Sequence, residues 1–193
     1  MNMNSTLSLL IVLTVVTLTG CLAAAVGAVG ITSVDVIHDR RTVGAYVDDG
    51  AIEVKAKHYI LTNEDLRKDT HINVTSMNGI VLLTGEAPTP ALRDKMVTNI
   101  RQIEGVRQVV NEVTTAGKTA MMSRTNDTWL TAKVKTKLFE KTKLDANRVK
   151  VVSERGNVYL MGVMSRAEAQ TATEAARQVG GIVRIVKVFE YTD

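Results

Sequence analysis

The sequence is poor in cysteine, histidine and aromatic residues, and each shortage narrows what the protein can be. A single cysteine among 193 residues excludes an intramolecular disulfide. The three histidines lie on unrelated segments, and with one cysteine they do not form a pattern of zinc ligands, so a Cys/His zinc site is disfavoured. Aromatic residues make up 4% of the chain, with one tryptophan, so the core must be mainly aliphatic. The 45% hydrophobic content excludes a wholly disordered chain, and the length suits one ordinary domain or two small ones.

Catalytic motifs are missing as well. The sequence contains no Gly-x-Ser-x-Gly, no phosphate-binding loop and no His-Glu-x-x-His. Of the neighbouring carboxylates, we expect Asp48-Asp49 to cap a helix and Glu64-Asp65 to lie in a solvated turn. We therefore predict no catalytic residue, no metal site and no cofactor, and a protein that is not an enzyme.

The net charge of +4 is unevenly distributed. Residues 48–116 carry 8 basic and 10 acidic residues, whereas residues 126–193 carry 12 basic and 8 acidic residues. A basic half beside a slightly acidic half suggests an anionic partner for the basic half.

Residues 1–20 have the pattern of a secretory signal peptide. Residues 7–18 form an apolar run that is too short to span a membrane, which needs about 20 residues. No Lys or Arg precedes this run, so the usual positive start rests on the α-amine alone. The segment ends Leu18-Thr19-Gly20-Cys21, which resembles the bacterial lipobox.

The lipobox resemblance implies that Cys21 is acylated and becomes the first residue of the mature chain. Several acyl chains, at about 0.8 kcal/mol per buried CH₂, would anchor the protein almost permanently. Leu22 after this cysteine resembles the sorting pattern for the outer membrane. The alternative is a free or buried thiol next to an ordinary signal peptide. We expect residues 21–47 to form a lipidated N-terminus and tether.

The rest of the chain contains two copies of one unit. The pattern Gly-x-Val-x-Leu-x-Gly occurs at residues 79–85 and again at 156–162, and flanking segments repeat at similar offsets. Each copy predicts the order helix, strand, strand, helix, strand. The expected elements of the first copy are a helix at 50–61, strands at 71–76 and 80–86, a helix at 90–103 and a strand at 106–114. Those of the second are a helix at 128–141, strands at 148–153 and 157–163, a helix after a Ser165/Glu168 capping box, and a final strand.

This order and the glycine pattern resemble the BON domain. The full layout, from the lipobox through both units, resembles the dual-BON outer-membrane lipoproteins, although Lys187 stands where the first copy has Asn111. The resemblance implies an α+β fold of two tandem BON domains, each α-β-β-α-β with two helices packed on a three-stranded mixed sheet. The expected division is a signal peptide at 1–20, a lipidated tether at 21–47, BON domain 1 at 48–116, a linker at 117–125 and BON domain 2 at 126–193.

The first helix of the second copy combines the lone tryptophan with lysines. At about 100° per residue, Leu130, Val134 and Leu138 form its buried stripe, so Trp129 faces outward. Basic residues with outward aromatics are typical of a helix that lies on an anionic membrane. The alternative is an ordinary solvated helix whose tryptophan lies in the core or packs at a domain junction. The first copy has Ala51 at the matching position and lacks the combination.

The family resemblance implies that this helix makes the phospholipid contact. The predicted phospholipid-binding residues are Thr128, Trp129, Lys133, Thr136, Lys137, Phe139 and Lys141. The expected partners are phosphatidylglycerol and cardiolipin in the inner leaflet of the outer membrane, with no nucleic acid. By resemblance the protein would face the periplasm, support envelope integrity and gather at division sites. The alternative function is a periplasmic adaptor that docks through BON domain 1 on outer-membrane assembly machinery, and a small-ligand binder is a third reading.

Overall fold

The computed structural model describes residues 41–116, 121–141 and 148–193, which belong to one compact unit of the chain. The expectations for the signal peptide, for Cys21 and for most of the tether lie outside the described residues. Within the described ranges, no helix is both long enough and apolar enough to cross a membrane.

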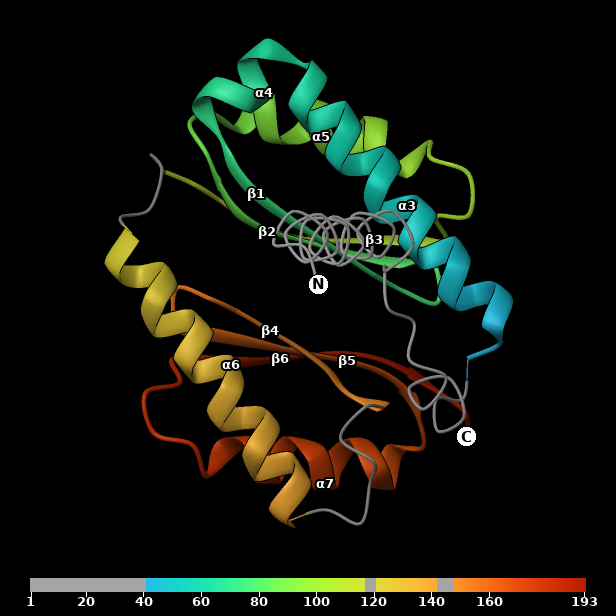
Figure 1. Ribbon diagram of the computed structural model, residues 1–193, viewed down its shortest axis with the longest axis vertical. Coiled ribbons are helices and arrows are strands. Elements are labelled where there is room, and N and C mark those ends of the chain that lie inside the picture. Colours follow the sequence, from blue (N-terminus) through green and yellow to red (C-terminus); the bar gives the residue numbers. More distant parts are fainter. Residues whose placement is uncertain (1–40, 117–120, 142–147) are drawn as a thin grey trace, which may run out of the picture. The chain divides into compact units, whose positions relative to one another are not determined.

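The first half of the chain folds around a three-stranded sheet with order β1-β2-β3. Strand β1 is antiparallel to β2, and β3 is parallel to it. Figure 1 shows helices α3 and α5 on the same face of this sheet. The elements are α3 (Val43–Thr62), α4 (Glu64–Asp69), β1 (His71–Met77), β2 (Ile80–Ala87), α5 (Pro90–Arg101) and β3 (Gln108–Thr115).

The second half repeats this topology with a sheet of order β4-β5-β6, again antiparallel and then parallel. Its elements are α6 (Met121–Lys141), β4 (Lys150–Glu154), β5 (Asn157–Met164), α7 (Arg166–Arg177) and β6 (Arg184–Tyr191). The expected α+β fold with two mixed sheets is confirmed, and so is the capping box at the start of α7. Strand boundaries agree with the sequence analysis to within about two residues.

The turns between paired strands explain why glycine recurs at the same position, 79 and 156, in both copies of the repeat. Asn78 and Gly79 have φ of 51° and 73°, and Arg155 and Gly156 have φ of 51° and 76°. Two successive positive φ values define the turn that suits a two-residue hairpin. A Cβ on Gly79 would also lie 2.7 Å from the carbonyl oxygen of Gly105, so a side chain is excluded there on both grounds.

The first helix starts earlier than predicted, and its cap is a different residue. Helix α3 begins at Val43, and the side chain of Thr42 accepts a hydrogen bond from the backbone N–H of Ala45 at 3.1 Å. The prediction that Asp48 or Asp49 caps this helix is therefore wrong. Helix α6 likewise begins at Met121 rather than near 128.

The buried Asp49 binds the hairpin turn of the first sheet instead. It is 4% exposed, and its carboxylate accepts hydrogen bonds from Ser76 Oγ at 2.7 Å and from the backbone N–H of Asn78 at 2.7 Å and of Gly79 at 2.9 Å. Arg41 forms an ion pair with it at 2.7 Å. In the sequence, a carboxylate near the start of an apolar helical pattern has the appearance of a helix cap. The hydrogen-bond donors that Asp49 uses instead come from the β1–β2 turn, which approaches it only in the folded structure.

Asp127 does the same in the second copy, where it accepts hydrogen bonds from the backbone N–H groups of Arg155 and Gly156, both at 2.8 Å. The solvated turn expected at Glu64-Asp65 is also corrected. These two residues form the first turn of the short helix α4, and the side chain of Asn63 caps it. Carboxylates in the first turn of a helix are favourable beside its unpaired N–H groups.

Each half has its own aliphatic core between sheet and helices. The predicted stripes of α3 and α6 are confirmed as buried: Ile52, Ala56 and Ile60 in the first, Leu130, Val134 and Leu138 in the second. Strand residues alternate between two faces, and those on the face away from the helices form a third cluster that joins the two sheets. This shared cluster consists of Met77, Leu82, Tyr159, Met161 and Val188.

Ion pairs surround this shared cluster. Glu53 of α3 contacts Lys150 of β4 at 2.9 Å, and Arg107 beside β3 contacts Glu190 of β6 at 3.0 Å. A further pair joins Glu112 of β3 to Arg184 of β6. Each repeat of fewer than 70 residues has a marginal core when alone, so burial of the second sheet face adds stability that neither copy has by itself.

Candidate functional site

The outer face of α6 presents aromatic and basic side chains to solvent. Trp129 is 50% exposed and Phe139 is 77% exposed, whereas the buried stripe of the helix faces its sheet. The predicted outward orientation of the tryptophan is therefore confirmed. The ammonium of Lys133 lies 3.6 Å from the centroid of the Trp129 ring, which is a cation–π contact. The helix thus holds a positive charge directly beside an exposed indole.

A pocket of about 460 Å³ adjoins this pair. Four of the predicted residues line it from α6, namely Trp129, Lys133, Thr136 and Lys137. The opposite wall is formed by Gln178, Val179 and Gly180 at the end of α7. Sequence reasoning missed this wall because it lies about 40 residues further along the chain. The Gly180-Gly181 helix end was the available signal, but nothing local showed that it returns to α6.

The remaining predicted residues do not share this pocket. Thr128 lines a different pocket, beside the strands β1 and β4. Phe139 is exposed but contributes nothing to the pocket wall. The side chain of Lys141, like Cys21, lies outside the described residues. The predicted site is therefore one pocket plus a separate exposed aromatic residue.

The charge at this surface is positive but partly compensated. Lys133 and Lys135 of α6 are both exposed. Lys137 forms an ion pair with Glu140 at 3.2 Å, which reduces its attraction for an external anion. An exposed pair of this kind is worth about 0–1 kcal/mol, so an anionic surface can replace Glu140 at little cost.

A second exposed surface lies on α3. Val43, Val47, Val54 and Leu61 are each more than half exposed and fall within about 40° of one another around the helix. We call these four residues the α3 stripe. Gly50 lies between Val47 and Val54 on the same side of the helix, and no atom lies within 4 Å of where its Cβ would be. Exposed aliphatic side chains that line up along a helix are typical of a contact surface rather than of scattered surface residues.

The part of the chain that the structure describes contains no candidate metal site. No group of three or more His, Cys, Asp or Glu side chains there is arranged to hold a metal ion.

Comparison with known proteins identifies both halves of the chain. The BON domain family matches residues 48–117 and 126–193. The chain is 35% identical over 176 residues to the outer membrane lipoprotein DolP of Haemophilus influenzae, covering 91% of each. It is also 35% identical over 153 residues, 79% of each chain, to a 21 kDa hemolysin of Actinobacillus pleuropneumoniae. The osmotically-inducible protein Y of Escherichia coli is 29% identical over 143 residues, 72% of this chain and 71% of that one.

Proposed function

The chain belongs to the BON-domain family and carries two copies of the domain, and from this premise we propose that it is an outer-membrane lipoprotein that binds anionic phospholipid through α6. The observation that carries the proposal is the half-exposed Trp129 with Lys133 over its ring, beside a pocket closed by the end of α7. The relative from Haemophilus influenzae, an outer membrane lipoprotein, supports the location. In this role the protein faces the periplasm, supports envelope integrity and gathers at division sites.

The expected strength of the contact follows from area and charge. About half of a 200 Å² indole is available at Trp129, which is worth about 2.5 kcal/mol when buried at 25 cal/mol per Å². Each of Lys133 and Lys135 adds about 1 kcal/mol near an anionic surface, and less at high salt. The sum gives a weak, reversible contact. An acyl anchor on Cys21 would hold the helix near the membrane, so this contact selects lipid type and place.

The test is co-sedimentation with vesicles, using a Cys21→Ser chain so that acylation does not mask the helix. We expect binding to phosphatidylglycerol and cardiolipin vesicles and not to phosphatidylcholine vesicles. Trp129→Glu should reduce this binding at least tenfold, because it removes the indole and adds a negative charge. The repeat supplies a matched control, since Ala51→Glu changes the equivalent position of the first copy. Equal binding by all three chains would refute the proposal.

A second candidate function is favoured by the α3 stripe. A solvated helix of a monomeric domain gains nothing from four aligned aliphatic side chains, and a protein partner that covers them does. We therefore also propose docking of the first domain on outer-membrane assembly machinery through this surface. A photo-crosslinking residue at Val54 should capture a protein in membranes, and one at Lys95, on the exposed face of α5, should not. Absence of adducts from Val54, or equal adducts from both positions, would remove this candidate.

A further inference from the structure

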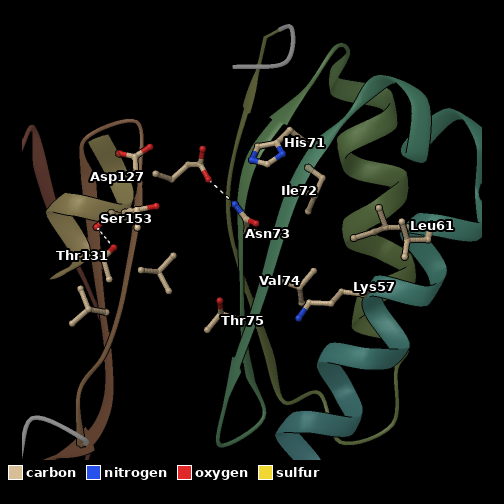
Figure 2. A pocket seen from close by; sticks show the side chains of 15 residues that line it. Lys57, Leu61, His71, Ile72, Asn73, Val74, Thr75, Asp127, Thr131 and Ser153 are labelled. Carbon is tan, nitrogen blue, oxygen red and sulfur yellow. Dashed lines mark hydrogen bonds between the residues drawn. The ribbon is translucent and has the colours of Figure 1, made fainter. Parts of the chain in front are cut away.

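A further hollow of the described residues belongs to neither of these surfaces. It measures about 560 Å³ and lies between β1 and β4, which are edge strands of their two sheets (Figure 2). Residues 72–75 of one strand and 151–154 of the other line it without a break, so backbone and side chains both face it. A pocket of this size is in the range that holds small ligands.

The walls of this interstrand pocket combine aliphatic side chains with hydroxyl, amide and charged groups. Ile72, Val74 and Val151 provide apolar surface, and the hydroxyl of Thr131 donates to Ser153 Oγ at 2.8 Å. No Phe, Tyr or Trp is among the described residues that line the pocket. A quaternary ammonium ion has no N–H donor and finds no cage of Phe, Tyr or Trp here, whereas an extended alkyl chain fits the apolar part of the walls.

One oxygen of a buried carboxylate in this pocket lacks a hydrogen-bond partner among the described residues. Glu154 is 4% exposed, and its Oε2 accepts a hydrogen bond from Asn73 Nδ2 at 2.8 Å, drawn as the dashed line that ends at Asn73 in Figure 2. Its other oxygen, Oε1, is buried and has no hydrogen-bond partner among the described residues. An unpaired buried carboxylate oxygen is costly. A small rotation of the Glu154 carboxylate that exposes Oε1 to a donor in the pocket would therefore gain the interaction that is missing.

We propose that the interstrand pocket binds an aliphatic primary amine, whose ammonium donates a hydrogen bond to Glu154 Oε1 while its alkyl chain lies against Ile72, Val74 and Val151. A primary ammonium has three donors, enough to satisfy the carboxylate and a neighbouring hydroxyl together. Asp127 lines the same pocket and adds a second negative charge. The inference does not depend on lipid binding by α6, because Trp129 lies outside this pocket.

The charged groups around the carboxylate predict how binding depends on pH. The pKa of Glu154 is raised, mainly because the carboxyl is buried. The negative charges of Glu86 and Asp127 raise this pKa further. The hydrogen bond from Asn73 and the charge of His71 act in the opposite direction. Lys57 lines the pocket from α3 and is paired with Glu53 at 3.3 Å. Arg155 approaches Glu86 at 4.0 Å. Protons compete with the amine for the carboxylate, so amine affinity falls as the pH drops through this raised pKa.

The primary ammonium could come from a free diamine or from the ethanolamine group of a lipid. Putrescine and O-phosphorylethanolamine serve as the two probes, and 1,4-butanediol is the uncharged control for putrescine. Each is titrated into the Cys21→Ser chain while amide shifts are followed by NMR. We expect putrescine to shift amides of residues 71–75 and 151–154, with no shift from butanediol. Shifts from O-phosphorylethanolamine at the same residues would identify a lipid headgroup as a source of the amine.

Glu154→Gln tests the role of the carboxylate with little change of shape. It should weaken putrescine binding at least tenfold, and Glu174→Gln, on the exposed face of α7, should not change it. Trp129→Glu should also leave it unchanged, which separates this pocket from the proposed lipid surface. A direct readout needs no variant: the ¹³C-detected pKa of the Glu154 carboxyl should fall when putrescine is bound. Equal affinity of the Glu154→Gln chain, or shifts spread over exposed carboxylates such as Glu174, would overturn the proposal.

Discussion

Replacing Asp49 by alanine should destabilise the protein severely, whereas replacing the adjacent Asp48 should have little effect. The two residues look alike in sequence, where either could cap a helix. In the structure Asp48 is exposed in the second turn of α3, and Asp49 is buried against the β1–β2 turn. The comparison therefore separates the local interpretation from the tertiary one.

The expected magnitude comes from the contacts of Asp49. Its carboxylate accepts four hydrogen bonds, two of them from backbone N–H groups of the turn, one from Ser76 Oγ, and one from Arg41, with which it forms an ion pair at 2.7 Å. Removal leaves these buried donors without their acceptor, and breaking a buried charged pair by removing one partner costs about 3–5 kcal/mol. A helix cap would cost about 1 kcal/mol at either position. Total stabilities of about 5–15 kcal/mol make this difference easy to measure.

Urea unfolding of the Cys21→Ser chain, followed by circular dichroism, is the assay. Asp49→Ala should lower the midpoint strongly at unchanged slope, Asp48→Ala should shift the free energy of unfolding by less than about 0.5 kcal/mol, and Asp49→Asn should fall between them because it keeps one acceptor oxygen. Asp127→Ala in the second copy should behave like Asp49→Ala, since it binds the equivalent turn. Equal and small effects at Asp48 and Asp49 would refute the reasoning.

Three further predictions concern stability. Burial raises the pKa of Tyr159 to about 12, so stability should fall as the pH rises from 10 to 12, and Tyr159→Phe should flatten that fall in pH-dependent unfolding. The pKa of Glu154 is also raised, so its contribution to stability is present at low pH and lost as the pH rises through that pKa. At pH 7 the Glu154→Gln chain should therefore unfold at a higher temperature than the parent chain. A lower unfolding temperature would contradict this direction of the pKa shift. Gly79→Ala should cost more than about 1 kcal/mol in urea, because the position has φ of 73° and a Cβ would lie 2.7 Å from a carbonyl oxygen, whereas Gly50→Ala should stabilise or change nothing.

Part of the candidate site could be predicted because its signal is local. The periodicity of apolar residues around Leu130, Val134 and Leu138 placed Trp129 on the outer face of its helix, and a 100° step depends on no distant residue. The opposite wall of that pocket, at Gln178 to Gly180, could not be predicted in the same way. The position of this wall depends on how α7 packs on the sheet, and the sequence of α6 alone carries no information about that packing.

The sequence by itself determined the repeat, the order of elements, the strand positions and the Asn78-Gly79 turn. These follow from alternation, helical periodicity and turn chemistry, all of which act over a few residues. The tertiary structure decided which distant residues of the two copies contact one another. It set Asp49 against the hairpin, placed Leu82 and Tyr159 in one cluster between the sheets, and left Glu154 with an unpaired oxygen in the interstrand pocket. Those contacts join residues between 27 and 81 positions apart, and only chain packing brings such residues together.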